Sequence, residues 1–443
     1  MIERLKQEVF LPYFQQAEKD PSQFKVGLEQ ELLGFVQATH RRITYKEHIL
    51  PILQGFADCC GWEPYYEGDN LIALKRNGCS ITLEPGGQLE LSLKPFASLS
   101  EISQALTDYQ SQLHKLSKDL GIVWLSMGYD PLSAPDQVPF VPKRRYQVMG
   151  DYLPPLGAGA HHMMKLTATA QSNLDFSSEQ DMAAKMLVTT ALSPLVSTLF
   201  ATSPFRLGGF SGYKSMRNWT WRAMDPSRCG YLDFVFDEGF NYSRYIDYIL
   251  DVPMLVLERK QGTLDFHGES FRTFCQKGRQ GVRFEPRDWQ VQMGCTFPVA
   301  RLRNAIETRT ADAGPLSHLL GQAAFWKGLL YDPISLEQTT ALIRSRGSEF
   351  FKNLHVSSYV EGFDALNHES ERMNLFEAVL DMAAAGLARL DQAQTQQDAV
   401  YLLPIRQIFQ KRQALSDQMI ERFLQGRPQD LFSLLGEFDL IFA

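Results

Sequence analysis

Residues 80–93 alternate between polar and apolar side chains on either side of a tight turn. The segment reads SITLEPGGQLELSL, and Pro85-Gly86-Gly87 separates its two halves. Because successive side chains of a strand point to opposite faces, this pattern predicts a β-hairpin with one apolar and one polar face. The polar face carries the carboxylates of Glu84 and Glu90. Carboxylates that face a cavity need a metal, a base or a proton.

Three other segments place hydrogen-bonding side chains on one face of a predicted strand. In residues 26–35, Glu29 and Glu31 are two positions apart and therefore share a face. In residues 166–176 polar positions alternate with alanine and leucine, and in residues 301–315 arginines and a glutamate line up together. The polar faces of these three segments carry Glu29, Glu31, Thr167, Thr169, Gln171, Asn173, Asp175, Arg301, Arg303, Glu307 and Arg309.

Helical patterns fill much of the remaining chain. A capping box that begins at Ser98 precedes a periodic segment that stops at Gly121. A second helical segment is predicted from Ser177 to about Thr202, with a kink at Pro194. Helical patterns then dominate from about residue 316 to about 425.

Strands and helices interleave without a regular βαβ rhythm and without a glycine-rich dinucleotide fingerprint. We therefore expect an α+β fold with a mainly antiparallel sheet. No linker or repeat divides the sequence, so a single catalytic domain is expected over residues 1–443, mainly helical from about 316. The proline-rich stretch 130–159 is interpreted as a long ordered loop, and its basic cluster at 143–146 favours a functional role.

Composition narrows the classes of function. Of the 443 residues, 44% are hydrophobic, which is enough for a large core. The net charge of −7 gives no indication of the basic surface that binds nucleic acid. No apolar run predicts a membrane span. The N-terminal segment MIERLKQEVF lacks the pattern of a signal or transit peptide, so a cytoplasmic location is expected. The six cysteines have no zinc-site spacing and are expected to be reduced.

Acidic and arginine side chains that lie together on one face of a sheet are typical of enzymes that transfer a phosphoryl group with the help of Mg²⁺. Mg²⁺ prefers carboxylate and phosphate oxygens, and arginine binds carboxylate or phosphate bidentately. The chain has no Walker A motif, which excludes a P-loop. Arg217 lies in an aromatic-rich segment, which favours a pocket. If the adjacent His161 and His162 lay on a strand, at most one would enter the site, so neither is assigned to it.

These motifs, in this order, resemble the glutamate–cysteine ligases, specifically the plant-type branch that also occurs in bacteria. The resemblance covers roughly residues 24–335. It rests on GLEQE, TLEPGGQLELS, Arg145-Tyr146, TATAQSNLDFSS, ATSPF, SMRNW, DYILDVPM, Glu307-x-Arg309 with Ala311-Asp312, and FWKGLLYD.

The resemblance implies a glutamine-synthetase-like fold, in which a curved antiparallel sheet forms a bowl flanked by helices. It also implies the reaction and its cofactors, ATP and Mg²⁺. ATP phosphorylates the γ-carboxylate of glutamate, and the amine of cysteine then attacks the γ-glutamyl phosphate. The products are γ-glutamylcysteine, for glutathione or a related thiol, with ADP and phosphate. The implied partners are small-molecule substrates, with no nucleic acid and no membrane.

The resemblance further implies roles for individual residues. It assigns Glu29, Glu31, Glu84 and Glu90 to magnesium; Gln171 and Asn173 to ATP; Arg145, Tyr146, Thr169 and Arg217 to glutamate; and Arg303, Glu307 and Arg309 to the transferring phosphoryl group, with Glu307 as a further ligand or nucleotide contact.

Two positions depart from the family pattern. Leu166 stands where the plant-type enzymes usually have arginine, and Thr310 stands where they usually have glycine. Both bear on the acceptor, so a γ-glutamyl ligase that uses another amine is an alternative. A non-catalytic binding protein would hydrolyse no ATP. A hydrolase with paired carboxylates would act without ATP, and that hypothesis leaves the arginines at 301–309 unexplained.

Overall fold

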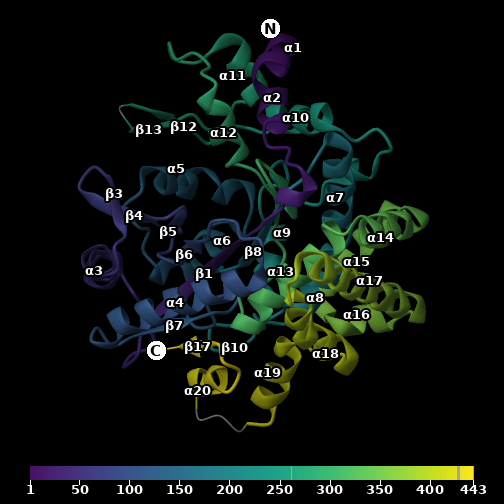
Figure 1. Cartoon of the computed structure of the whole chain (residues 1–443). Helices are drawn as coiled ribbons and strands as arrows, with labels where there is room; N and C mark the ends of the chain where they lie inside the picture. Colours follow the sequence, from purple (N-terminus) through teal and green to yellow (C-terminus); the bar gives the residue numbers. More distant parts are fainter. Residues whose placement is uncertain (261, 427–429, 443) are drawn as a thin grey trace.

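A long antiparallel sheet forms the centre of the computed structural model, which describes residues 1–260, 262–426 and 430–442 (Figure 1). Its main path runs β15-β16-β8-β1-β6-β5-β4-β3. The strands are β15 (Ala300–Leu302), β16 (Ile306–Thr308), β8 (Ala170–Leu174), β1 (Val26–Val36), β6 (Leu89–Ser92), β5 (Cys79–Leu83), β4 (Asn70–Arg76) and β3 (Glu63–Glu67). All neighbours on this path are antiparallel, which confirms the predicted α+β class.

Strand β1 connects the two parts of the sheet because it is long enough to pair twice along its length. Its first half pairs with β6 on one side and β8 on the other, and its second half pairs with β7 (Ile122–Leu125) and β2 (Arg41–Arg42). Near the C-terminus, β17 (Ile441–Phe442) adds to β7. Further two-stranded sheets pair β9 (Phe205–Arg206) with β10 (Gly209–Phe210), β11 (Cys229–Gly230) with β14 (Phe297–Pro298), and β12 (Val256–Arg259) with β13 (Gly262–Asp265).

One face of the central sheet is apolar and packs against helices α4 (Leu99–Lys118) and α13 (Leu316–Leu330). Leu28 and Leu91 project from the sheet into this core and are almost fully buried. The predicted capping box is confirmed, since Ser98 accepts from the backbone of Glu101 and the Glu101 carboxylate accepts from the backbone of Ser98. This packing presents the alternate, polar positions of β1, β6 and β8 on the opposite face.

The polar face is covered by α5 (Arg144–Tyr152), α6 (Ala160–Leu166) and α9 (Met216–Arg222). In Figure 1, α5 and α6 lie on one side of β5 and β6, and α4 lies on the other. The interpretation of 130–159 as a loop is wrong in part, because α5 occupies the segment between Pro142 and Pro154. The strand assumed for His161 and His162 is also wrong, since both lie on α6. There, His161 Nε2 contacts Gly150 O at 3.0 Å, and His162 Nδ1 contacts Tyr129 Oη at 2.5 Å.

Three predicted elements are shorter than expected. The helix expected from Ser177 is two helices, α7 (Glu179–Ala191) and α8 (Ser193–Leu199), bent by 47° where Pro194 enters the first turn of α8. The strand expected over 166–176 is β8 alone, because Leu166 ends α6. The strand expected over 301–315 is the hairpin β15–β16, closed where Arg303 N donates to Ala305 O at 2.9 Å.

The remaining helices surround the sheet and form most of the chain after residue 316 (Figure 1). They are α1 (Ile2–Leu5), α2 (Leu11–Gln15), α3 (Leu50–Cys60), α10 (Tyr242–Asp251), α11 (Phe271–Lys277), α12 (Arg287–Met293), α14 (Pro333–Arg346), α15 (Ser348–Glu361), α16 (Phe363–Asn367), α17 (Ser370–Gln394), α18 (Leu403–Lys411), α19 (Leu415–Leu424) and α20 (Leu431–Gly436). Within the described part of the chain, no single helix has the length and hydropathy to cross a membrane, and only α7 and α8 taken together as a bent pair meet that criterion.

Helices α13 and α17 approach each other closely where two glycines meet. A Cβ on Gly386 would lie 2.0 Å from Gly328 O, and a Cβ on Gly328 would lie 2.2 Å from Ala383 O. Both contacts are with backbone atoms, which cannot move aside as a flexible side chain can. The crossing therefore requires glycine at both positions.

We expect Gly386→Ala to lower the free energy of unfolding by about 1–3 kcal/mol, because the added methyl group forces the two helices apart. Denaturant unfolding followed by circular dichroism measures this change. Gly436→Ala in α20 is the matched control, since no atom lies within 4 Å of a Cβ at that position. Equal stability of the two variants would contradict the close crossing.

Candidate active site

A cavity of about 520 Å³ lies over the polar face of β1, β6 and β8, and we call it the acid cavity. Strands supply its floor, and α5, α6 and α9 supply its walls. Most of the site residues expected from the sequence line it: Glu29, Glu31, Glu84, Glu90, Arg145, Tyr146, Thr169, Gln171, Arg217, Arg303 and Arg309.

Glu31, Glu84 and Glu90 form a cluster in which one carboxylate oxygen from each lies within 4.8 Å of the others. The register of the sheet brings two of them together, because Glu31 lies directly opposite Glu90 across the β1–β6 pair. The turn between β5 and β6 supplies the third, since Glu84 N donates to Gln88 O at 3.0 Å. This turn also requires Gly86, where a Cβ would lie 2.5 Å from Lys165 O.

Burial and repulsion between neighbouring carboxylates raise the pKa of Glu29, Glu31 and Glu84. Burial, with repulsion from Glu307 and Glu90, raises the pKa of Glu29 to about 8. Burial and the charge of Glu90 raise the pKa of Glu84 to about 7, and burial with two neighbouring glutamates raises the pKa of Glu31 well above its usual range. A cation placed among these oxygens would replace the protons and relieve the repulsion.

Glu307 is also buried but has a different electrostatic environment. Arg301 donates to its two oxygens at 2.9 and 2.8 Å, and Arg309 pairs with it as well. Burial alone would raise the pKa of Glu307, but Arg301 and Arg309 overcome that effect and lower it to about 2. Glu307 is therefore ionised, and its charge fixes the Arg309 guanidinium.

Glutamine and asparagine side chains connect this ion-paired group to Glu29. Arg309 Nη1 donates to Gln171 Oε1 at 2.8 Å, and Gln171 Nε2 donates to Glu29 at 2.9 Å. Asn173 Nδ2 donates to the other oxygen of Glu29 at 3.0 Å. The network holds Arg309 and Glu29 in fixed positions at one end of the acid cavity.

Arg217 is a buried arginine with unused hydrogen-bonding capacity. Its Nη2 donates to Arg309 O at 2.8 Å, whereas Nε and Nη1 have no partner among the described residues. Helix α9 is held in place by Asp312, which accepts from Ser203 Oγ at 2.6 Å and from Ser215 Oγ at 2.8 Å. Arg217 lines the acid cavity, and a guanidinium with two nitrogens that lack a partner among the described residues is suited to binding an anion.

Thr169 and the residues of α5 hold the geometry of the cavity. Thr169 N donates to Glu31 at 3.0 Å, and its hydroxyl donates to Ala311 O at 2.8 Å. Arg145 Nη2 donates to Gly294 O at 2.6 Å, and Tyr146 Oη donates to Leu83 O at 2.7 Å.

The structure does not bring every expected side chain into the acid cavity. Asn173 and Glu307 lie behind its lining and act through Glu29 and Arg309. Asp175, expected on the same face of its strand, instead pairs with Lys19 at 2.6 Å. Leu166 does not line the cavity either.

Sequence analysis missed Lys143 as a site residue. Its Nζ donates to Leu83 O and to Tyr146 Oη, both at 3.1 Å, and it lines the acid cavity near Glu84. Burial lowers the pKa of Lys143, and the charges of Glu84 and Glu90 oppose that effect. The basic run at 143–145 was the available signal, but only Arg145 was carried over by the family motif.

Arg309 also packs against two neighbouring aromatic side chains that the sequence did not place there. Its guanidinium carbon lies 5.3 Å from the ring centre of Trp221 and 5.9 Å from that of Phe297. These cation–π contacts fix the plane of a group that already pairs with Glu307. Both rings line the acid cavity.

Comparison with known proteins identifies the family and the relatives that this chain resembles. The sequence model described as glutamate-cysteine ligase family 2 matches residues 25–432. The chain is 37% identical over 392 residues to the chloroplastic glutamate–cysteine ligase B of Oryza sativa subsp. japonica, covering 88% of this chain and 79% of that protein. It is 36% identical over 390 residues to the chloroplastic glutamate–cysteine ligase of Nicotiana tabacum, covering 87% of this chain and 74% of that one.

Among solved structures, a glutamate–cysteine ligase from Francisella tularensis in complex with AMP matches 94% of this chain and 97% of its own. The sequence identity of this pair is 14%, and the TM-score is 0.43.

The expected cytoplasmic location is wrong by this comparison. The relatives matched over most of the chain, from Oryza sativa, Nicotiana tabacum, Medicago truncatula and Arabidopsis thaliana, are chloroplastic enzymes. The N-terminal segment MIERLKQEVF therefore does not support the inference of a cytoplasmic location.

The resemblance inferred from the sequence motifs is confirmed. The family model spans most of the chain, and the curated relatives exceed one third identity over nearly nine tenths of it. The chain therefore belongs to glutamate–cysteine ligase family 2.

Proposed function

We propose that this protein is an ATP-dependent ligase that joins the γ-carboxylate of L-glutamate to the amine of L-cysteine. The observation that carries the proposal is a single cavity in which Glu31, Glu84 and Glu90 lie opposite Arg217 and Arg309. Phosphoryl transfer to a carboxylate needs both sets of groups: acids that hold cations near the phosphates, and arginines that bind the carboxylate and the transferring group.

The donor set of the acid cavity fits Mg²⁺. Its ligands would be the hard carboxylate oxygens of Glu31, Glu84 and Glu90, with Glu29 and Gln171 at a second position. A cation there would offset the effects that raise the pKa of Glu29, Glu31 and Glu84. When bound, the metal supplies positive charge that offsets the negative charge of the phosphate oxygens.

The arginines of this chain bind and orient the reacting groups. Arg217 lines the acid cavity, and its Nε and Nη1 have no partner among the described residues, so it is suited to bind a carboxylate of glutamate. Arg309 is fixed by Glu307, Trp221 and Phe297, so it meets the transferring phosphoryl group without having to reorient. Arg303 lines the same end of the cavity.

The reaction proceeds in two displacements. An oxygen of the glutamate γ-carboxylate attacks the γ-phosphorus of ATP, and ADP leaves. The amine of cysteine, after losing its extra proton, attacks the acyl carbon, and phosphate leaves with the former carboxylate oxygen. The protein aligns the groups and compensates charge at both steps, so no side chain has to act as a nucleophile. The product is γ-glutamylcysteine, the precursor of glutathione or a related thiol.

A direct test measures ADP release with glutamate, Mg²⁺, ATP and a panel of amines. We expect rapid ADP formation with cysteine and little when glutamate or the amine is omitted. Turnover with another amine but none with cysteine would replace the proposed acceptor. Absence of ADP under every combination would contradict ligase activity altogether.

Glu31→Gln and Glu90→Gln are each expected to lower kcat by about a hundredfold or more, because each removes a carboxylate ligand of the proposed Mg²⁺. The thermal stability should hold or rise, since each change also relieves repulsion between carboxylates. The exposed Glu63→Gln on β3 is the matched control and should keep the wild-type rate. Near-wild-type turnover in both site variants would refute the assignment.

The raised pKa values also predict how pH and Mg²⁺ act together on stability. Glu29 and Glu84 bind protons more tightly in the folded protein than in the unfolded chain, so without metal the free energy of unfolding falls as the pH rises from about 4.3 toward 8. Mg²⁺ binds the ionised carboxylates. We therefore expect it to raise Tm more at about pH 9 than at about pH 6.

Differential scanning calorimetry with Mg²⁺, or with sodium chloride at equal ionic strength, measures this difference. A Mg²⁺ effect on Tm that is the same at both pH values would contradict the proposal that these carboxylates hold the metal.

A further inference from the structure

A buried ion pair lies next to the turn that carries Glu84. It joins Arg42 of β2 to Asp130, which lies in the loop after β7. The two side chains are 2% and 0% exposed, and Arg42 Nη1 donates to Asp130 Oδ2 at 3.2 Å. Because desolvation offsets much of the attraction within a buried ion pair, the pair adds little stability by itself, and its other contacts indicate its role.

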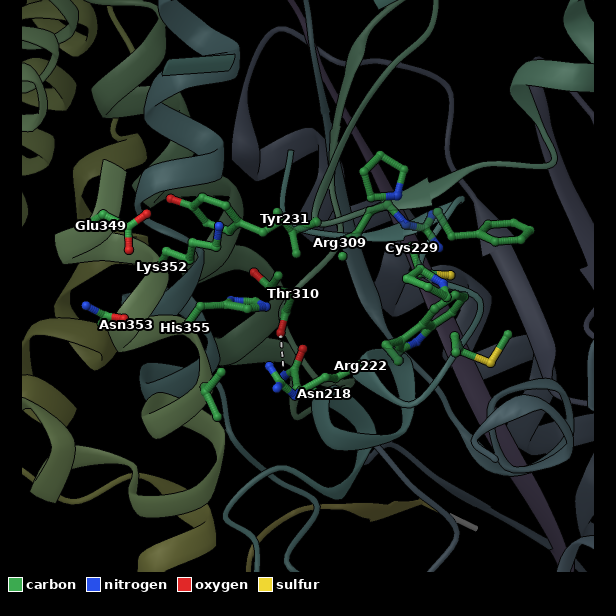
Figure 2. Close-up of a pocket in the computed structure, with 18 residues that line it drawn as sticks. Asn218, Arg222, Cys229, Tyr231, Arg309, Thr310, Glu349, Lys352, Asn353 and His355 are labelled. Carbon is green, nitrogen blue, oxygen red and sulfur yellow. Dashed lines mark hydrogen bonds between the residues drawn. The ribbon is translucent and has the colours of Figure 1, made fainter. Parts of the chain in front are cut away.

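The ion pair lies outside both cavities of the site. A second cavity, of about 640 Å³, adjoins the acid cavity and shares Trp221, Phe297 and Arg309 with it; we call it the outer cavity (Figure 2). Neither Arg42 nor Asp130 lines the acid cavity or the outer cavity. A substitution in the ion pair therefore removes no group that lines either cavity.

The guanidinium of Arg42 joins two backbone segments. Its Nη2 donates to Gly86 O at 2.9 Å, and its Nη1, besides the contact with Asp130, donates to Lys165 O at 3.2 Å. Gly86 belongs to the turn between β5 and β6, and Lys165 lies in the last turn of α6. One side chain therefore connects the acid-bearing hairpin to the end of α6.

Asp130 fixes the position of this guanidinium. Its Oδ1 accepts from the backbone N–H groups of Leu132 and Ser133, each at 2.9 Å, which leaves Oδ2 for Arg42. The backbone N–H of Asp130 donates to Leu166 O at 2.7 Å. The carboxylate is thus held by its own loop, and the guanidinium reaches the two carbonyls from one fixed position.

The turn between β5 and β6 is held from outside at consecutive residues. Gly86 N donates to Met164 O at 3.1 Å, and Val141 N donates to Pro85 O at 3.0 Å. Those two contacts come from the backbone, whereas the contact to Gly86 O comes from the Arg42 side chain. A substitution of Arg42 therefore releases one side of the turn and leaves the backbone contacts in place.

Both segments that the guanidinium joins lead to carboxylates of the acid cavity. Glu84 lies two residues before Gly86. Thr169 lies four residues after Lys165, and its backbone N–H donates to Glu31 at 3.0 Å. Because Mg²⁺ demands nearly ideal octahedral geometry, its affinity depends on the spacing of these carboxylates.

We propose that Arg42 is a positioning residue of the ligase, which sets the spacing of Glu31 and Glu84 and thereby the affinity of the acid cavity for Mg²⁺. This inference rests on the proposed function, because it takes the acid cavity to be the metal site. Arg42 contacts neither metal nor substrate and acts through the carbonyls of Gly86 and Lys165. The planar guanidinium is required, since its separate nitrogens reach separate acceptors at the same time.

Binding of Mn²⁺, which takes the same oxygen ligands and is paramagnetic, tests this role without relying on turnover. Electron paramagnetic resonance measures free Mn²⁺ as the ion is titrated into the intact protein without ATP. We expect Arg42→Lys to raise the Kd for Mn²⁺ about tenfold, as is common for groups that orient metal ligands. A protein that is only destabilised would show fewer binding sites at an unchanged Kd.

Two control variants define the measurement. Arg259→Lys also removes a buried guanidinium: the Arg259 side chain is 6% exposed, pairs with Asp288 and donates to Arg283 O at 3.2 Å. It lines neither cavity, so we expect the wild-type Kd for Mn²⁺. Glu31→Gln removes a proposed ligand and should weaken Mn²⁺ binding, which identifies the measured site as the acid cavity.

A double variant keeps the test decisive if Arg42→Lys does not fold. Arg42→Met with Asp130→Asn removes both charges, so neither is left buried and unpaired. Asparagine keeps an oxygen for the backbone N–H groups of Leu132 and Ser133. We expect this variant to fold and to raise the Kd for Mn²⁺ at least as much as Arg42→Lys, because methionine cannot donate to the carbonyl of Gly86.

The outcomes distinguish this inference from the function on which it rests. Wild-type protein that neither binds Mn²⁺ in the acid cavity nor releases ADP would contradict the proposed function. Wild-type binding of Mn²⁺ together with an unchanged Kd in folded Arg42→Lys, or in the folded double variant, would overturn the inference, because the acid cavity would then keep its geometry without the guanidinium.

Discussion

Mutual repulsion among half-buried carboxylates on one sheet face is the constraint on which the rest of the site depends. Glu31, Glu84 and Glu90 bring oxygens within 4.8 Å of one another, in surroundings that raise the pKa of Glu31 and Glu84. Such an arrangement persists only on a rigid support. The long antiparallel pairing of β1 and the apolar packing of its opposite face on α4 and α13 supply that support. The same alternation of side chains thus builds the core and concentrates the acids.

The charged groups in and around the acid cavity have two different roles: some orient an arginine, and others are proposed to hold a metal. Glu307 is neutralised within the protein by Arg301 and Arg309, so it serves to orient Arg309 rather than to attract a cation. Among the described residues, Glu31, Glu84 and Glu90 form no ion pair with a lysine or arginine, which favours the proposed metal there. Arg309, which packs against Trp221 and Phe297, lies where the acid cavity meets the outer cavity. One guanidinium therefore borders both cavities.

The sequence was most informative in the strands, where alternating polar and apolar residues predict which face of the sheet each side chain lies on. It predicted the hairpin at 80–93, the shared face of Glu29 and Glu31, and the α+β class. It did not predict that Arg301 lies opposite Glu307 across a hairpin, because a turn at 303–305 interrupts the apparent strand. It also missed the outer cavity, since α15 comes from a part of the chain without motifs and meets β11 and β14 only through tertiary packing.

The central claim is that the γ-carboxylate of glutamate is activated by phosphorylation before an amine attacks it. Glutamate carrying a heavy oxygen isotope in its γ-carboxylate, incubated with ATP, Mg²⁺ and cysteine, tests this most directly. Mass spectrometry of the released phosphate should find a heavy oxygen atom transferred from glutamate to each phosphate. Phosphate that contains none of the label would contradict the account, because the carboxylate would then never have been bonded to phosphorus.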